Sequence, residues 1–265
     1  MFEDISPHLE LAPDVSAGEW IASTLQPWGE DGLRLSSFMP EGFEAYVRVF
    51  HPLIFGWHTP ENERRWADVA AEHAAVLTPG VSIYDVLGID PLTSSAHPDG
   101  FPAVGELPQV ICERLVAILG QHTTTEDACY FGVWSGFGVF RGGGEIPSLL
   151  VGVPTEGERR EEERRREDAR AQQEDVQAQL DAISKLDCGR GREHFVFRGP
   201  LSAACSIHDA SWVTPALWWP QDRAWTVVTE IDGVCTYVGG SREAIDGVLA
   251  SDLESIEVTL DVHIS

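Results

Sequence analysis

Two acidic side chains near a predicted hairpin turn, Glu230 and Asp232, are the candidates for catalytic chemistry in this sequence. They lie where two β-rich runs, residues 225–231 and 234–238, are separated by Asp232-Gly233. Asp-Gly between two such runs predicts a β-hairpin with a two-residue type I′ turn, in which both turn residues have positive φ. The carboxylates are therefore expected at one end of a pair of antiparallel strands.

The register of this hairpin determines the expected surroundings of Glu230. It pairs Val228 with Tyr237 and Glu230 with Cys235, and it places all four side chains on one face of the sheet. A carboxyl group on an apolar face has its pKa raised, which is how proteins make general acids. The ordinary alternative is a partly solvated face, or an ion pair of Glu230 with Arg223 or Arg198.

A tryptophan-rich stretch precedes the hairpin. Four of the nine tryptophans fall within residues 212–225, beside Pro215 and Pro220. We interpret Trp225 as a core residue, and the two adjacent tryptophans either as core or as an exposed surface on which a ligand or partner stacks. The polar residues that follow could orient such a ligand. The candidate binding residues are therefore Trp218, Trp219, Asp222 and Arg223.

Known motifs for metals, nucleotides and nucleophilic catalysis are absent from the sequence. The five cysteines include no C-x-x-C pair, and the nine histidines are scattered. A zinc site can be drawn from Cys188, Cys205 and His208, but their spacing does not require one. We predict no metal and no cofactor.

The charge balance limits the possible partners. The chain has 265 residues, with 43 acidic and 18 basic side chains and a net charge of −25. Such a surface repels phosphates, so we expect no direct nucleic-acid binding and no membrane binding. It could attract a basic protein partner, or it could serve solubility alone. The N-terminal residues resemble no signal peptide, and we expect a cytoplasmic protein with reduced cysteines.

The spacing of apolar residues predicts the elements around these candidates. The fold class is α+β: an antiparallel or mixed sheet with helices packed mainly on one side, plus a long charged surface helix. Strands are predicted over residues 45–50, 129–134, 194–197 and 256–264, and helices after Thr59-Pro60, over 107–119 with Gly120 as the C′ residue, and after Ser241.

A charged segment divides the chain. Residues 156–187 contain eleven acidic and seven basic side chains, so most of the net negative charge lies elsewhere. We predict a helical arm over 154–190, docked by the apolar residues of its second half, between an N-terminal α+β part (1–153) and a C-terminal hairpin, helix and strand part (191–265). The three parts are expected to form one structural unit of undetermined oligomeric state.

Several segments resemble a family of uncharacterised actinobacterial proteins. They are WWPQDRAW (218–225) with the TEID and TYVGGS segments that end at Asp232 and Ser241, PEGFEAYVRVFHP (40–52) and FRGPL (197–201). The resemblance spans both halves and implies a cytoplasmic actinobacterial protein, with no activity attached. Residues 40–50 are also similar, by analogy only, to the SUKH group of acidic immunity proteins.

Two functions from different classes follow. The first is a non-enzymatic binding protein that holds a basic protein partner on an acidic surface that carries aromatic side chains. An immunity-type inhibitor of a basic toxin would be one version of it. The second is a hydrolase-type enzyme with its carboxylate site around Glu230 and Asp232. The sequence leaves open whether the protein is an enzyme.

Overall fold

The computed structural model describes residues 8–28, 33–56, 62–91, 97–137, 177–207 and 214–264, together with the single residues 140, 156, 164 and 174. Among these residues the fold is α+β, with one large and one small antiparallel sheet. None of the helices in this part of the chain has the length and apolar character needed to cross a membrane.

The large sheet has nine strands, and its strand order interleaves the two halves of the chain. The order is β1-β8-β6-β9-β10-β11-β2-β12, and β7 also pairs with β8. Strand β2 lies between β11 and β12, and β6 lies between β8 and β9. One sheet therefore contains strands from both sides of the 154–190 segment. The strands are β1 (Glu10–Leu11), β2 (Ala45–Phe50), β6 (Cys129–Trp134), β7 (Leu186–Asp187), β8 (Glu193–Gly199), β9 (Leu217–Pro220), β10 (Trp225–Thr229), β11 (Cys235–Gly240) and β12 (Ser255–Val258).

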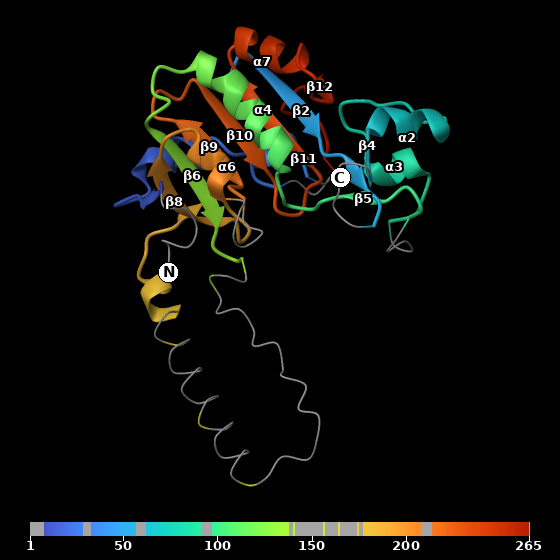
Figure 1. Cartoon of the computed structure of the whole chain (residues 1–265). Helices are drawn as coiled ribbons and strands as arrows, with labels where there is room; N and C mark the ends of the chain where they lie inside the picture. The colour runs from blue at the N-terminus through green and yellow to red at the C-terminus, as the bar shows by residue number, and fades with distance from the viewer. Residues whose placement is uncertain are drawn as a thin grey trace.

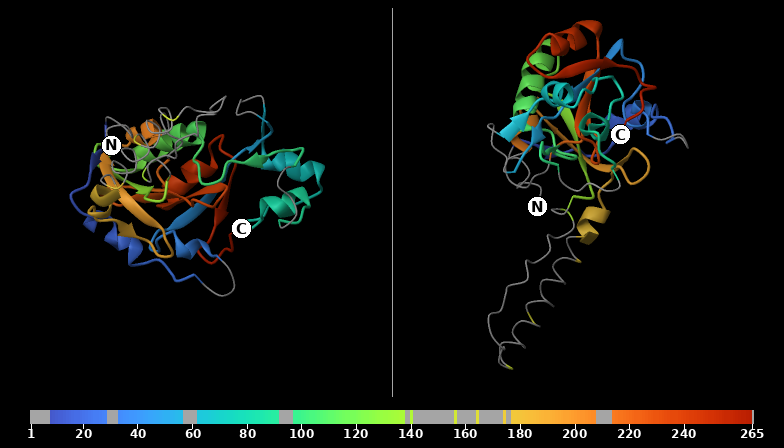
Figure 2. Two further views of the ribbon diagram at one scale, coloured as in Figure 1. Left: turned by 90° about the horizontal axis from the view of Figure 1, so that it is seen from below. Right: turned by 90° about the vertical axis from the view of Figure 1, so that its right-hand side faces the viewer.

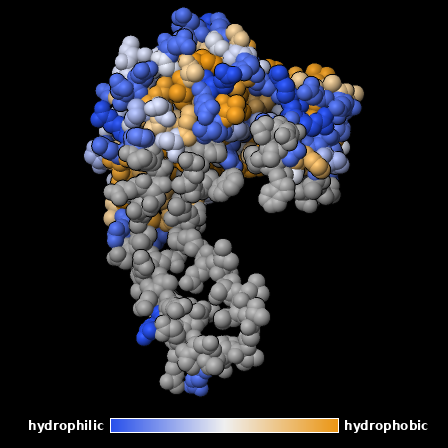
Figure 3. All heavy atoms as spheres, viewed as in Figure 1, coloured by the Kyte–Doolittle hydropathy of each residue, from blue (hydrophilic) through white to orange (hydrophobic). Residues whose placement is uncertain are grey.

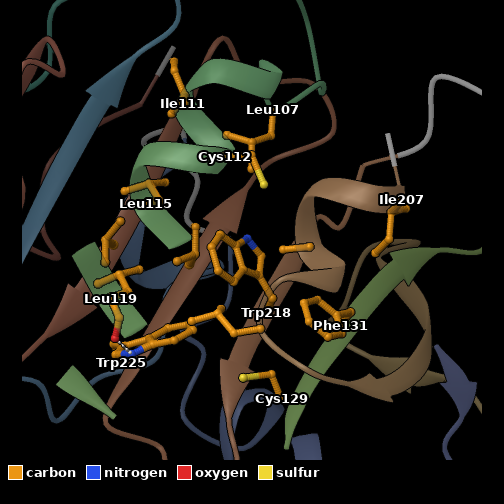
Figure 4. Close-up of a cluster of buried hydrophobic side chains, with 14 of the residues drawn as sticks. Leu107, Ile111, Cys112, Leu115, Leu119, Cys129, Phe131, Ile207, Trp218 and Trp225 are labelled. Carbon is orange, nitrogen blue, oxygen red and sulfur yellow. Dashed lines mark hydrogen bonds between the residues drawn. The ribbon is translucent and has the colours of Figure 1, made fainter. Parts of the chain in front are cut away.

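Helices cover one face of this sheet. Figure 1 shows α4 (Gln109–Leu119), α6 (Ala203–Ser206) and α7 (Arg242–Leu249) over the strands. Figure 4 shows the apolar cluster beneath them, in which Trp218 and Trp225 pack edge to face. The indole of Trp225 donates a 3.0 Å hydrogen bond to the Leu119 carbonyl.

The opposite face is covered by segments from the two ends of the chain. They include α1 (Glu19–Ala22), the 3-10 helices η1 (Ser16–Gly18) and η2 (Leu35–Ser37), and a C-terminal stretch in which Ile264 donates to the Leu33 carbonyl. The two cavities described below lie on this face.

A smaller unit projects beside the large sheet (Figures 1 and 2). Its sheet has the order β4-β3-β5, from β3 (Leu53–Ile54), β4 (Glu63–Arg64) and β5 (Phe101–Pro102), beside α2 (Trp66–Glu72) and α3 (Ile83–Leu87). Trp66 of α2 is fully buried and donates from Nε1 to the His51 carbonyl at 2.6 Å, which anchors the unit to the end of β2.

Most predicted elements are confirmed, with four corrections. The last strand, predicted over residues 256–264, is β12 (Ser255–Val258) and ends at Val258, because the chain turns at residues 260–261. The pairing of Val228 with Tyr237 is confirmed, but neither Asp232 nor Gly233 has positive φ, so the type I′ turn is wrong. Helix α2 begins at Trp66 rather than after Thr59-Pro60, because β4 precedes it. Gly120 has φ −58° and opens the 3-10 helix η4 (Gly120–His122), so it is not a left-handed C′ residue.

The predicted arm falls largely outside the described residues. Residues 177–181 are helical, and Leu180 is buried in the core as expected of a docking second half. The helix does not extend to Asp187, because Leu186 already belongs to strand β7.

Candidate functional site

An ion-paired cluster forms where the loop after β10 meets the start of β8. Arg192 donates from Nε to Glu230 Oε1 at 2.7 Å and from Nη2 to Asp232 Oδ2 at 2.6 Å. The second Glu230 oxygen accepts a 2.6 Å hydrogen bond from the Asp232 backbone N–H. Glu230 therefore has an ion pair, as in the ordinary alternative to a free general acid, but its partner is Arg192 rather than the expected Arg223 or Arg198. Arg223 precedes β10 at its other end, and Arg198 lies near the far end of β8.

Two adjoining cavities lie against this cluster. The smaller, of about 30 Å³, is bounded in part by Cys188, His194 and Thr229. The larger, of about 130 Å³, lies between the Arg192 cluster and the residues of β2 and β11 that face away from α4 and α7. Both cavities are lined by Trp28, Phe38, Arg192 and Glu230.

A buried arginine contributes to the wall of the larger cavity. Arg48, in the middle of β2, is 1% exposed. It donates from Nε to Cys235 Sγ at 3.2 Å and from Nη1 to the carbonyls of Pro79 and Val81, both at 2.9 Å. Its guanidinium also lies over the ring of Phe50. Within the described part of the chain, no carboxylate forms an ion pair with Arg48, so this buried cation is balanced only by dipoles and aromatic rings.

A tyrosine opposite Arg48 in the sheet register lines the same cavity. Tyr237 pairs with Arg48 across β11 and β2, and its side chain is 2% exposed. Its hydroxyl has no hydrogen-bond partner among the residues that the structure describes. Burial raises its pKa well above the usual range, so the phenol is protonated and able to donate. Buried hydroxyls normally have partners, so this one is available to a ligand or a water.

The thiols around the cavities are poor nucleophiles. Burial raises the pKa of the Cys188 thiol to about 12. Burial also raises the pKa of Cys235, although Arg48 partly offsets the effect. Both groups are therefore protonated thiols at neutral pH, and thiolate chemistry is not favoured at this site.

His194 at the smaller cavity is a neutral group. Burial lowers its pKa to about 4, so the imidazole is uncharged at neutral pH. Together with Glu230, it gives this cavity a polar side against the apolar Ala216 and Leu217.

Trp218 and Trp219, predicted as candidate binding residues, are not exposed. Both lie in β9, a central strand between β6 and β10, and they are 0% and 1% exposed. Their side chains point to opposite faces, Trp218 into the cluster under α4 and Trp219 against Tyr130 at 5.6 Å. Because both faces of the sheet are covered, the hypothesis of an exposed stacking surface is wrong.

Asp222 and Arg223 lie at the other end of β10 from Glu230, so the predicted residues do not form one site. Asp222 accepts hydrogen bonds from Thr123 Oγ1 at 2.9 Å and from the Thr124 N–H at 2.7 Å. Although its burial acts in the opposite direction, these hydrogen bonds hold the pKa of Asp222 below the usual range. Arg223 has φ +58° and lies 5.3 Å over the Trp20 ring. Both residues have structural contacts that account for them.

One described cluster has the composition of a metal site. In the small unit, His73 Nε2 and His97 Nδ1 lie 2.8 and 3.4 Å from Asp99 Oδ2. The other Asp99 oxygen pairs with Arg64, a cation that disfavours a second positive charge. We interpret the cluster as an ion-pair network that joins α2 to the loop before β5. Of the zinc set drawn from the sequence, His208 lies outside the described residues.

Sequence reasoning found Glu230, Asp232, Cys235 and Tyr237 but missed the residues that complete the cavity, including Trp28, Phe38, Arg48 and Arg192. Three of these residues lie within positions 28–48 and Arg192 lies far along the chain, and only the fold brings them to one cavity. One local signal existed, because Arg48 is a charged residue inside the apolar strand AYVRVF.

Comparison of the chain with protein-family models, with curated proteins and with solved structures gave no match. The function is therefore argued from the cavity itself.

Proposed function

We propose that this protein binds a small organic carboxylate in the 130 Å³ cavity, and that it is a binding protein rather than an enzyme. The observation that carries the proposal is the Tyr237 hydroxyl, a buried donor without a partner among the described residues, beside the buried Arg48 guanidinium. A ligand carboxylate would accept a hydrogen bond from the phenol and neutralise the arginine at the same time.

The charge of Arg48 favours an anion over a neutral ligand. Burying a guanidinium is costly, and no carboxylate among the residues that the structure describes pairs with Arg48. The carbonyls, thiol and aromatic rings that it contacts offset this cost only in part. An anion in the adjoining cavity would supply a counter-charge that the described residues do not, at a place where screening by water is weak.

The size and walls of the cavity favour a ligand with a compact apolar body. An engineered protein cavity of about 150 Å³ holds benzene. Leu33, Phe38, Val234 and Ile264 provide apolar wall, and the Trp28 ring closes one side under Arg192 at 5.0 Å. A ligand of the size and character of benzoate fits these constraints.

The same geometry is less favourable for the hydrolase-type alternative. Arg192 pairs with both Glu230 and Asp232, and the second Glu230 oxygen accepts from the Asp232 N–H, so contacts within the protein account for the position of both carboxylates. Asp232 is also 76% exposed, where its carboxylate is well solvated. The support for this alternative is the position of Glu230 beside a cavity. Hydrolysis of ester substrates that Glu230→Gln abolishes would revive it.

The hypothesis of a basic protein partner has lost its aromatic surface, because Trp218 and Trp219 are buried. In the view of Figure 3, hydrophilic side chains cover most of the coloured face, with small apolar patches between them. The net charge of −25 still supports this hypothesis, but it serves solubility equally well.

Isothermal titration with sodium benzoate, with benzamide as the neutral isostere and inorganic phosphate as a second anion, tests the proposal. Benzoate is expected to bind and benzamide to bind at least ten-fold more weakly, since hydrogen bonds to a charged group contribute about 1.5–3 kcal/mol. Tyr237→Phe should weaken benzoate binding ten-fold or more. Tyr130→Phe, a matched change on β6 outside the cavity, should leave it unchanged.

Three results would overturn the proposal. They are no benzoate binding at millimolar concentration, equal binding of benzoate and benzamide, and an unchanged affinity in Tyr237→Phe. Tighter binding of phosphate than of benzoate would keep an anion site but reject the organic carboxylate.

A further inference from the structure

Two cysteines meet between helices on the face of the sheet opposite the cavities. Cys112 lies on α4 and Cys205 on α6, and their Sγ atoms are 3.0 Å apart. Figure 4 shows the Cys112 sulfur directed into the buried cluster rather than toward solvent. The five cysteines of the chain are all free thiols in this structure.

The separation of these two sulfur atoms is unusually short for a non-bonded pair. Carbon atoms, which are smaller, have their optimal contact at about 3.5–4.0 Å. A disulfide bond measures about 2.05 Å, so the two sulfur atoms need to approach by only ~1 Å. Since the two residues are 93 positions apart, the fold rather than the local chain brings them together.

We propose that Cys112 and Cys205 are a site of reversible oxidation and form a disulfide bond in the folded protein. The pair takes a peroxide as its oxidant and a dithiol as its reductant. The proposal is independent of ligand binding, because neither cysteine lines the two cavities.

The two thiols have unequal environments, which assigns their roles. Cys112 is 2% exposed, whereas Cys205 is half-buried and open to a small oxidant. The Cys112 thiol lowers the pKa of Cys205 by hydrogen bonding, and the same contact together with burial raises the pKa of Cys112. Cys205 therefore ionises first and is the attacking group.

The chemistry balances in two steps. The Cys205 thiolate attacks one oxygen of hydrogen peroxide, the O–O bond breaks, and a sulfenic acid and hydroxide form, with the hydroxide taking a proton to become water. The Cys112 sulfur then attacks the sulfenic sulfur, releasing the second oxygen as water as the Cys112 proton is transferred. In total, two thiols and one peroxide give one disulfide and two waters.

The cross-link would join α6 covalently to α4. Helix α6 has only four residues and no side-chain cap, so packing holds it in place. A bond to the eleven-residue helix α4, whose face is buried on the sheet, would fix α6 against the core.

Peroxide treatment of the folded, full-length protein tests the proposal. Thiol titration in denaturant should fall from five groups to three, and the intact mass should fall by two hydrogens, with dithiothreitol restoring both values. Proteolytic digestion should yield a linked pair of peptides that contain Cys112 and Cys205.

Matched variants locate the reaction. Cys205→Ser should abolish the loss of two hydrogens, whereas Cys188→Ser, also a partly buried cysteine, should retain it starting from four thiols. Circular dichroism of Cys205→Ser checks that the variant is folded, and Cys205→Ala is a second form of the same test. A linked peptide from a different pair, or oxidation of Cys205 to sulfinic acid in place of the disulfide, overturns the proposal.

Discussion

At the residue scale, two buried histidines make the free energy of unfolding depend on pH. His51 and His194 are 0% and 4% exposed, and burial lowers the pKa of each to about 4, against an unperturbed value of 6.5. His51 contacts Thr236 Oγ1 at 2.8 Å, so its neutral ring is part of the packing between β2 and β11. Protonating either ring in place would put a charge in the core.

The direction of the pH effect follows from these values. Between pH 6.5 and 4 the unfolded chain binds protons that the folded protein does not, so stability falls as pH falls through this window. Each histidine should contribute a loss of about 2 kcal/mol between pH 7 and pH 5. Urea denaturation of His194→Gln should show a shallower loss than wild type over this range. The exposed control His263→Gln should show the wild-type loss, and an unchanged slope in His194→Gln would contradict the assignment.

The same scale shows what the sequence could reveal about the site. Glu230, Cys235 and Tyr237 were found because an Asp-Gly pair and a strand register predict a shared face from local sequence. The exposed alternative for Trp218 and Trp219 was considered because Pro215 and Pro220 on either side suggested a loop. Pro220 ends the strand, and no local pattern reports that both sheet faces are covered.

The loop between β10 and β11 is the element that holds the acidic cluster. The Gly233 N–H donates to the Glu230 carbonyl at 2.9 Å, so the turn has Ile231 and Asp232 at its centre. The predicted turn had Asp232 and Gly233 at its centre. Gly105, from the segment before α4, packs against this loop and donates to the Gly233 carbonyl at 2.8 Å. The predicted type I′ turn does not form, and this contact from outside the hairpin is a tertiary interaction that the local sequence does not indicate.

Replacing Gly105 should therefore disturb the loop that holds Glu230 and Asp232 in their ion pairs with Arg192. Gly105 has φ +68°, and an added Cβ would lie 2.1 Å from the Ile231 carbonyl oxygen. Gly105→Ala should cost more than 2 kcal/mol of stability by urea denaturation, because the backbone strain adds to a clash with backbone. Gly88→Ala is the matched control, since Gly88 has φ +66° with no atom within 4 Å of the added Cβ.

The expected cost at Gly88 is only the backbone strain of about 1 kcal/mol. Equal losses in the two variants would show that the contact with Ile231 does not contribute. Gly105→Ala should also weaken benzoate binding more than Gly88→Ala does, because the loop carries cavity residues.

At the scale of the whole molecule, the interleaved sheet makes the two halves depend on each other. β2 has both of its neighbours, β11 and β12, in the C-terminal part, and β6 has both of its neighbours, β8 and β9, there as well. Local patterns predicted most of these strands, but not their order. Pairing between segments so far apart depends on the packing of the complete chain.

A split protein tests this dependence. Fragments 1–153 and 154–265, produced separately, should each lack the dispersed amide spectrum of a folded sheet, because each leaves inner strands with unpaired edges. Co-expression should restore a folded complex that contains both. A folded 1–153 fragment on its own would contradict the expectation of mutual dependence.

The position of β2 also has a consequence for synthesis on the ribosome. Residues 45–50 are made early, but the segments that flank them in the sheet are not made until residues 235–258. At ~5–20 residues per second, the apolar strand waits roughly 10–40 s for its partners. During that interval residues 45–50 (AYVRVF) have no native partner strand on either edge. We therefore expect the nascent chain to be most prone to aggregation, and to need chaperones, before residues 235–258 are made.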